Sequence, residues 1–125
     1  MKPILLAAGL FSLLWLLPVP ARAGSDAFHV ANWNVENLYD TADDPDNRYD
    51  DEFLPNNVTT RWTRARFETK LDNLARVIAD MNHGEGPDLL GLQEIENRYV
   101  LEELARRLPG KPYGIVHFDS PDPRG

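Results

Sequence analysis

The stretch GPDLLGLQEIEN, residues 86–97, contains the pattern that decides the fold of this chain. Gly86-Pro87-Asp88 is a turn sequence. The apolar run over residues 89–95 that follows it ends in polar side chains, which is typical of a buried strand. A buried strand with helical sequence on both sides indicates an α/β protein. The segments around it decide whether this expectation holds.

Glu94 is the most informative residue of this stretch, because it lies at the carboxyl end of the expected strand, where α/β sheets place ligand sites. Gln93, Glu96 and Asn97 are its neighbours in sequence. Carboxylate and amide oxygens of this kind suit Mg²⁺, Mn²⁺ or Ca²⁺. The alternative is a solvated strand end whose acidic residues lie near the positive N-terminus of the next helix. The pattern alone leaves both interpretations open.

An amphipathic helix precedes the strand. Its apolar residues recur at spacings of four, three, four and three, which places them on one buried stripe. They are Phe67, Leu71, Leu74, Ile78 and Met81. The helix is expected to begin between residues 61 and 63 and to end at His83-Gly84, with Gly84 as its C-terminal cap. Its basic residues indicate a solvated outer face rather than a nucleic-acid patch; they are Arg61, Arg64, Arg66 and Lys70.

Three further elements complete the order strand, helix, strand, helix, strand. Residues 28–35 alternate between apolar and polar side chains, which predicts a first strand with an irregularity near Ala31. Asn97 can cap a second helix. The residues expected on the inner side of that helix are Val100, Leu101, Leu104 and Leu108. Residues 113–118 alternate again and predict a third strand, so the chain is expected to be an α/β protein.

Asn34 is a second candidate site residue, because it lies near the carboxyl end of the first expected strand, between Trp33 and Val35. Its amide oxygen could bind a hard cation or orient a phosphate, while its NH₂ group could donate to a carboxylate. The alternative is a buried asparagine that satisfies backbone groups. Asn32 and Asn37 leave the same two interpretations open.

The composition limits the classes of function. The chain has 125 residues, no cysteine and a formal net charge of −7. Without cysteine, disulfides and thiolate metal sites are excluded. The negative charge argues against a broad phosphate-binding surface, which needs clustered lysine and arginine. A compact site that holds its own cation is compatible with it.

The first residues are typical of an export signal. Met1-Lys2 is a short positive start, residues 4–17 are almost entirely apolar, and Ala21-Arg22-Ala23 has the small-x-small pattern of a signal-peptidase site. We expect residues 1–23 to be cleaved, leaving residues 24–125 as an exported domain, periplasmic or extracellular. The alternative, a membrane anchor, would need an apolar run of about 20 residues. We therefore expect no stable membrane insertion after cleavage.

An acidic loop, about residues 40–60, follows the first strand. Seven of the thirteen residues from Asp40 to Glu52 are acidic, and prolines and an Asn-Asn pair disfavour regular structure. Its acids do not match the EF-hand, because Arg48 stands where a ligand is required and the loop glycine is missing. We expect a solvated loop, with a calcium-binding loop as the alternative.

Two segments together resemble the endonuclease/exonuclease/phosphatase family, which has the deoxyribonuclease-I-like fold. Asn32-Trp33-Asn34-Val35-Glu36-Asn37-Leu38-Tyr39-Asp40 is similar to the opening motif of that family. Pro87-Asp88-Leu89-Leu90-Gly91-Leu92-Gln93-Glu94-Ile95-Glu96-Asn97 is similar to its second motif, in which a strand ends in Gln-Glu. Residues 62–82 and 119–125 are similar to exported bacterial members. The resemblance covers residues 28–125 and implies the N-terminal part of a four-layer α/β sandwich.

The resemblance implies roles for three residues of this chain. Glu94 matches the family's metal-ligating glutamate, which holds Mg²⁺ or a similar ion against phosphate oxygens. Asn34 matches the asparagine that helps to orient the scissile phosphate and the metal site, and Arg124 is a candidate phosphate contact. Members hydrolyse phosphate esters of nucleic acids, inositol lipids or sphingomyelin, by metal-assisted attack of water. The expected partner is therefore a phosphate ester, with nucleic acids among the candidates.

The chain also departs from the family pattern. The later motifs, an Asp-x-Asn pair and a C-terminal Asp-His pair, have no counterpart after Asn97. We therefore expect the N-terminal part of an exported, metal-dependent phosphoesterase, with little or no activity in this polypeptide as given. The alternative is a secreted module without catalysis that uses the acidic loop to bind a cation or a cationic partner.

Overall fold

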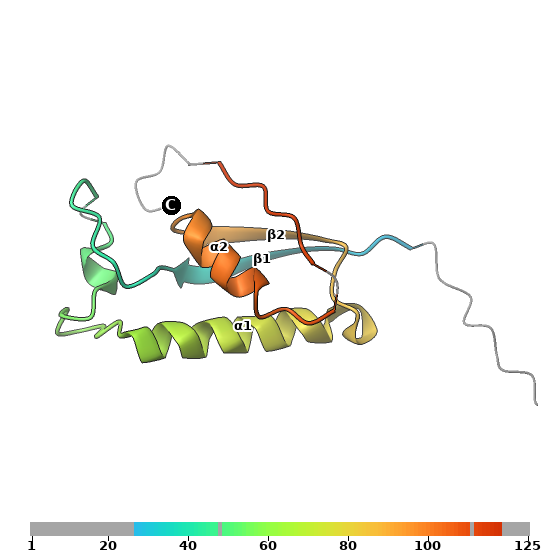
Figure 1. Ribbon diagram of the computed structural model, residues 1–125, viewed down its shortest axis with the longest axis horizontal. Coiled ribbons are helices and arrows are strands. Elements are labelled where there is room, and N and C mark those ends of the chain that lie inside the picture. Colours follow the sequence, from blue (N-terminus) through green and yellow to red (C-terminus); the bar gives the residue numbers. More distant parts are fainter. Residues whose placement is uncertain (1–26, 48, 111, 119–125) are drawn as a thin grey trace, which may run out of the picture.

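The computed structural model describes residues 27–47, 49–110 and 112–118. Its elements are strand β1 (Val30–Leu38), a short 3₁₀ helix η1 (Asp51–Phe53), helix α1 (Arg64–Gly84), strand β2 (Leu89–Ile95) and helix α2 (Arg98–Ala105) (Figure 1). The expected α/β class is confirmed. The predicted signal peptide lies outside the described residues. Among the helices that are described, none combines the length and the apolar character that crossing a membrane requires.

The two strands pair in parallel, and helix α1 lies between them in sequence. The register runs from Val30 opposite Leu89 to Asn34 opposite Gln93, and it resumes at Leu38 opposite Ile95. Between these points β1 contains two more residues than β2, which is a wide irregularity of the ladder. The prediction of an irregularity near Ala31 was therefore wrong in position. It lies at the carboxyl end of β1.

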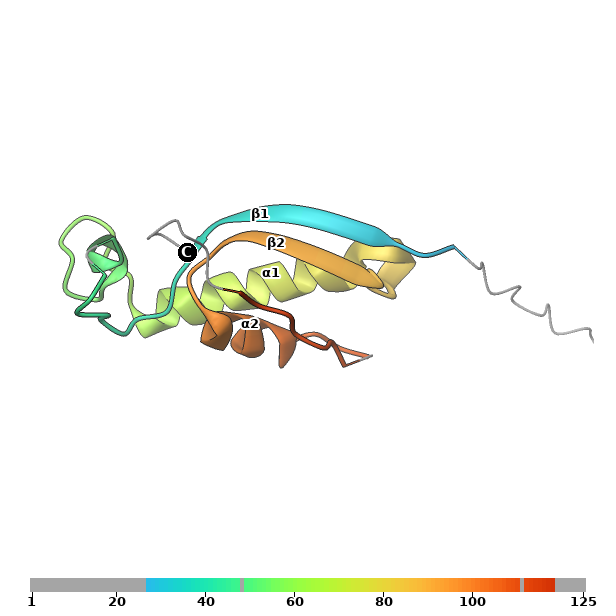
Figure 2. The same cartoon turned by 90° about the horizontal axis from the view of Figure 1, so that it is seen from above.

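Both helices pack on one face of the sheet, as Figure 2 shows from above. The predicted stripe of α1 is confirmed: Phe67, Leu71 and Ile78 are fully buried. The rest of the core comes from the inward residues of the strands and of α2. These are Val35, Leu38, Ile95, Val100 and Leu104, with Leu74 and Ala75 of α1. No described helix covers the opposite face of the sheet, and Val30 and Leu89 are exposed on it.

Local sequence signals position the helix starts. Thr63 caps α1, since its side chain accepts a hydrogen bond from the Arg66 backbone N–H, and Asn97 caps α2 by accepting from the Val100 N–H at 3.1 Å. The end of α1 differs from the expected Gly84 cap. The backbone leaves helical geometry at Met81, and Asn82 turns the chain in the left-handed region. An asparagine tolerates this region better than most residues do.

The third strand predicted at residues 113–118 is not formed. The segment is extended, and its half-buried and exposed residues alternate as expected, but no strand is assigned to it in residues 112–118. A cavity of about 340 Å³ lies between this segment, β2 and α2. A ladder needs direct backbone contact at about 4.8 Å. In the described residues the segment therefore lines this cavity and does not pair with β2.

The acidic loop is anchored by aromatic side chains. Tyr39 is fully buried and stacks on Phe53 of η1, with ring centroids 4.1 Å apart. Trp62 meets Phe53 edge to face, and its indole N–H donates to the Tyr39 carbonyl at 3.0 Å. Most of the loop is exposed, as expected, but Asp50 is buried. The loop thus has a small core of its own.

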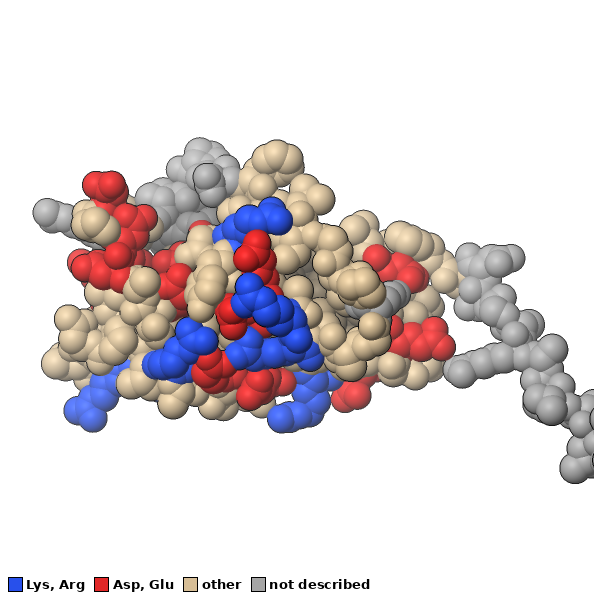
Figure 3. Space-filling model, in the orientation of Figure 1, with Lys and Arg blue, Asp and Glu red and all other residues tan. Residues whose placement is uncertain are grey.

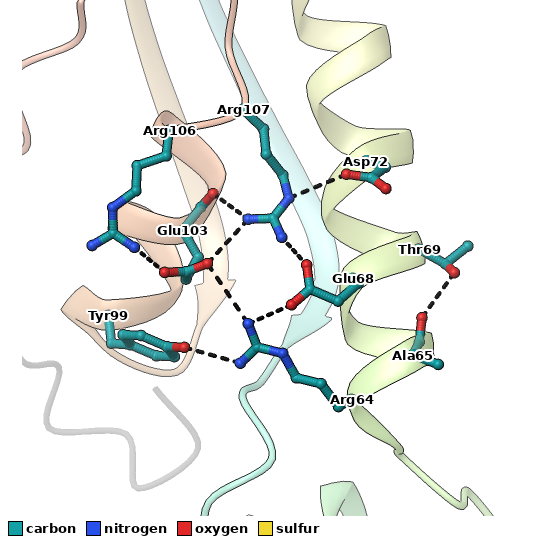
Figure 4. Close-up of polar contacts among 9 residues, drawn as sticks. All are labelled: Arg64, Ala65, Glu68, Thr69, Asp72, Tyr99, Glu103, Arg106 and Arg107. Atoms are coloured by element: carbon teal, nitrogen blue, oxygen red, sulfur yellow. Dashed lines mark hydrogen bonds and ion pairs between the residues drawn. The ribbon is translucent and has the colours of Figure 1, made fainter.

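Ion pairs connect α2 to α1 (Figure 4). The Arg107 guanidinium contacts Glu68, Asp72 and Glu103, with distances of 3.1 Å to Asp72 and to Glu103. Arg64 bridges Glu68 and Glu103 from the other side. The side chain of Arg107 is only 21% exposed, so its charge is screened less than that of a typical surface arginine. This network holds the two helices together beside the apolar core.

Arg107→Met is therefore expected to lower the free energy of unfolding by about 1–2 kcal/mol, because three carboxylates lose their shared partner. Arg98→Met is the matched control. Arg98 is 56% exposed and, among the described residues, pairs with Glu102 on its own helix, so the expected loss is about 0.3–0.5 kcal/mol. Urea unfolding followed by circular dichroism measures both. Equal losses in the two variants would contradict the role assigned to the network.

Candidate functional site

Asn34 and Glu94 lie together at the carboxyl ends of the two parallel strands. The Asn34 Nδ2 donates a hydrogen bond to Glu94 Oε1 at 2.7 Å. The other carboxylate oxygen, Oε2, accepts from the backbone N–H of Asn37 at 3.0 Å. The carboxylate of Glu94 is thus held by two donors from β1, one on each oxygen, while the residue stays exposed.

The irregular end of β1 creates this arrangement. Glu36 and Asn37 have φ values of 56° and 60°, and Glu94 on the neighbouring strand has a φ of 60°. Left-handed backbone at a residue with a side chain costs about 1–2 kcal/mol. Part of this cost is offset locally, because Asn34 Oδ1 accepts from the Glu36 N–H at 2.9 Å. The turn directs the Asn37 N–H toward Glu94.

Lys70 of α1 supports the same turn from the helix side. Its ammonium group donates to the carbonyl oxygens of Glu36 and Asn37, the latter at 3.1 Å. Burial lowers the pKa of Lys70, while the charges of Glu36 and Glu94 oppose that shift. Sequence placed Lys70 on a solvated outer face, and this prediction was wrong. Lys70 directly precedes Leu71 of the buried stripe, which is the signal that could have placed it at the border of the core.

A polar pair extends the site along the open face of the sheet. Gln93 Nε2 donates to Asn32 Oδ1 at 2.7 Å. Gly91 leaves the space for this contact, because a Cβ there would lie 2.9 Å from Asn32 Oδ1. Asn32, Asn34, Gln93 and Glu94 are all exposed. These four residues therefore present amide and carboxylate groups to solvent.

Glu96 and Asn97, the other oxygen ligands expected beside Glu94, lie against Asp40 instead. Glu96 Oε2 accepts from the Asp40 backbone N–H at 2.7 Å, and Asn97 Nδ2 donates to Asp40 Oδ2 at 3.1 Å. Burial raises the pKa of Glu96 to about 7, and the nearby charges of Asp40, Asp50 and Asp44 act in the same direction. The structure thus separates the expected oxygen cluster into a Glu94 group and an Asp40 group.

The donor set around Glu94 fits a divalent cation. Each carboxylate oxygen accepts one hydrogen bond from β1 and has further lone-pair capacity, and a hard cation prefers such oxygens. Asn34 Oδ1 accepts one backbone hydrogen bond and also retains capacity. The ligand roles of Glu94 and Asn34 stay predictions. Arg124, the candidate phosphate contact, lies outside the described residues.

Comparison with models of known protein families gives a match. A model described as the Endonuclease/Exonuclease/phosphatase family matches residues 29–125. This range includes both motifs, the acidic loop and all helices of the described structure. No curated protein and no solved structure matches the chain.

The raised pKa of Glu96 predicts a pH-dependent stability. The folded state holds the Glu96 proton up to a pH of about 7, whereas an unfolded glutamate releases it near 4.5. Because the folded state binds more protons in this window, the free energy of unfolding falls as the pH rises from about 4.5 to 7. Glu96→Gln keeps the acceptor for Asp40 and removes the charge. It is expected to stabilise the chain at pH 8 by about 1–3 kcal/mol and to have much less effect at pH 4.5.

Urea unfolding at several pH values, with a chelator present, measures this difference. Glu52→Gln removes an exposed charge from the same region and is expected to shift the stability far less. A Glu96→Gln effect of the same size at pH 4.5 and pH 8 would contradict the argument.

Proposed function

The chain belongs to the endonuclease/exonuclease/phosphatase family, and we propose that it is part of a divalent-metal-dependent phosphoesterase. In this proposal the Glu94 carboxylate forms part of the metal site. Members of this family are generally hydrolytic enzymes. The observation that carries the proposal is the Glu94 carboxylate, fixed by Asn34 and the Asn37 N–H at the carboxyl edge of the sheet. The proposed ion is Mg²⁺, with Mn²⁺ or Ca²⁺ as the other candidates.

In this proposal Glu94 holds the cation and Asn34 orients Glu94. The Asn34 amide is itself oriented by the Glu36 N–H, so a chain of hydrogen bonds fixes the carboxylate before substrate binds. A bound divalent ion would supply charge stabilisation for phosphoryl oxygens. Since Asn34 is exposed beside Glu94, its amide oxygen is also available to the ion or to the substrate.

Lys70 is a positioning residue in this proposal. Its ammonium group binds the two carbonyls of the turn that carries the Asn37 N–H, and its charge interacts with Glu94. It therefore keeps the donor of Asn37 directed at the carboxylate, and its positive charge reduces the repulsion between Glu94 and Glu36.

The proposed substrate is a phosphate ester, and nucleic acids are among the candidates. The net charge of −7, which becomes −9 once Lys2 and Arg22 are removed with the signal peptide, disfavours a tight grip on long DNA. A short or small phosphate ester fits this charge better. We also propose that the protein acts after export, in the periplasm or outside the cell, on the basis of residues 1–23.

We further propose that the 125-residue polypeptide is inactive by itself. The family resemblance implies an Asp-x-Asn pair and an Asp-His pair, and residues 98–125 contain neither. The histidine of the latter pair would activate or position the nucleophile. The activity test is therefore made on the longest polypeptide that the gene encodes.

Glu94→Gln in that polypeptide is expected to reduce Mg²⁺-dependent hydrolysis of bis(p-nitrophenyl) phosphate by at least about 100-fold, because the variant loses the charge that binds the cation. Asn34→Ala is expected to cost about 10–100-fold, as loss of an orienting partner does. Initial rates across a range of Mg²⁺ concentrations measure both effects and separate metal affinity from turnover.

Glu52→Gln is the matched control, since Glu52 is an exposed glutamate outside the site. It is expected to keep the full rate. Circular dichroism checks that each variant is folded. Unchanged metal-dependent hydrolysis in a folded Glu94→Gln variant would overturn the proposed role of Glu94.

A further inference from the structure

Asp50 is the one buried charged residue of the described structure. It is 1% exposed and lies in the acidic loop, directly before η1. One carboxylate oxygen, Oδ2, accepts a hydrogen bond from the Asp44 backbone N–H at 2.8 Å. The other oxygen, Oδ1, is buried and has no hydrogen-bond partner in the part of the chain that the structure describes. A buried polar atom without a partner costs about 1–3 kcal/mol, and more when it is charged.

Two further carboxylates lie beside Asp50. One carboxylate oxygen from each of Asp43, Asp50 and Asp51 lies within 4.8 Å of the other two. Figure 3 shows acidic side chains gathered at this end of the molecule. Within residues 40–60 the sequence offers only one basic residue, Arg48. Three close carboxylates, one of them buried, repel one another, and a positive charge beside them would stabilise their charged forms.

A cation with oxygen ligands satisfies both requirements. It would neutralise the three carboxylates and give the buried Oδ1 atom a partner. Three oxygens within 4.8 Å of one another are close enough to share one ion. Calcium accepts many oxygen ligands in flexible geometry, so one buried and two exposed carboxylates from a loop suit it. Magnesium demands near-octahedral geometry and retains several waters, which makes it less suited to this set of carboxylates.

We propose that Asp43, Asp50 and Asp51 bind one calcium ion, at a site separate from Glu94. Asp50 supplies the buried ligand, Asp43 and Asp51 supply exposed ones, and water or loop carbonyl groups complete the coordination. The spacing is not that of an EF-hand, so the site depends on the fold of the loop.

The calcium site holds the loop against the end of β1. Asp50 and Asp51 lie at the start of η1, and Phe53 at the end of η1 stacks on Tyr39. Tyr39 directly follows β1, and its neighbour Asp40 contacts Glu96 and Asn97. An ion that fixes η1 therefore also fixes the segment that leaves the candidate site. The calcium site shares no ligand with Glu94 and does not depend on the proposed hydrolysis.

Calorimetric titration of the purified chain with calcium chloride, in 0.15 M KCl, tests the proposal. We expect one ion per chain, with a dissociation constant of about 0.1–1 mM, as in extracellular calcium modules. Asp50→Asn is expected to weaken binding at least tenfold, because it removes the charge of the buried ligand. Asp46→Asn is the matched control. It removes the same charge from an exposed residue of the same loop that is not in the cluster, and is expected to bind calcium like the parent.

Two more variants keep the test decisive. If Asp50→Asn fails to fold, the double variant Asp43→Asn, Asp51→Asn alters only exposed ligands and is expected to lose the same ion. Glu94→Gln is expected to retain it, so failure of the proposed function and failure of the calcium site give different results. No binding to the parent chain overturns the proposal, and so does equal weakening by Asp46→Asn and Asp50→Asn. Binding of magnesium as tightly as calcium overturns the assignment of the ion.

Discussion

The parallel pairing of β1 with β2 is the constraint on which the rest of the structure depends. Parallel strands need a long crossover, and here α1 supplies it and covers one face of the sheet. The pairing also brings two carboxyl ends to one edge, so Asn34 and Glu94 meet although sixty positions separate them in sequence. The two extra residues of β1 then turn the Asn37 N–H onto the same carboxylate. The fold and the candidate site therefore both follow from the register in which β1 pairs with β2.

Much of this fold could be predicted from periodicity and caps. The apolar stripe of α1, the Asn97 cap and the run at residues 89–95 are local signals, and each element appears where these signals indicate. The strand predicted at residues 113–118 fails because strand formation is not local: alternation shows which side chains turn inward, but a ladder also needs an edge within hydrogen-bond distance. The irregularity of β1 was misplaced for the same reason, since it is defined only relative to β2.

The candidate site likewise combines features that the sequence predicts with features that it does not. A carboxylate at the end of a buried strand and an asparagine at the end of another could be recognised in the sequence, and the α/β order predicts that they share an edge. Their hydrogen bond, the donor of Asn37 and the inward position of Lys70 could not. These depend on the left-handed backbone of Glu36, Asn37 and Glu94. They also depend on the Lys70 side chain, which reaches from α1 to the end of β1. Asp50 is a similar case. The composition of the loop predicts a solvated acidic segment, but the fold buries the Asp50 carboxylate.

The central claim is that the Glu94 carboxylate, held by Asn34 and Asn37, is a divalent-cation site. Titration with Mn²⁺, followed by NMR of the side-chain amide of Asn34 and the backbone amide of Asn37, tests it directly, because the paramagnetic ion broadens only nearby signals. We expect both signals to broaden at low Mn²⁺ in the parent chain and to persist in a folded Glu94→Gln variant. Signals that stay sharp in the parent, or that broaden equally in the variant, would contradict the account.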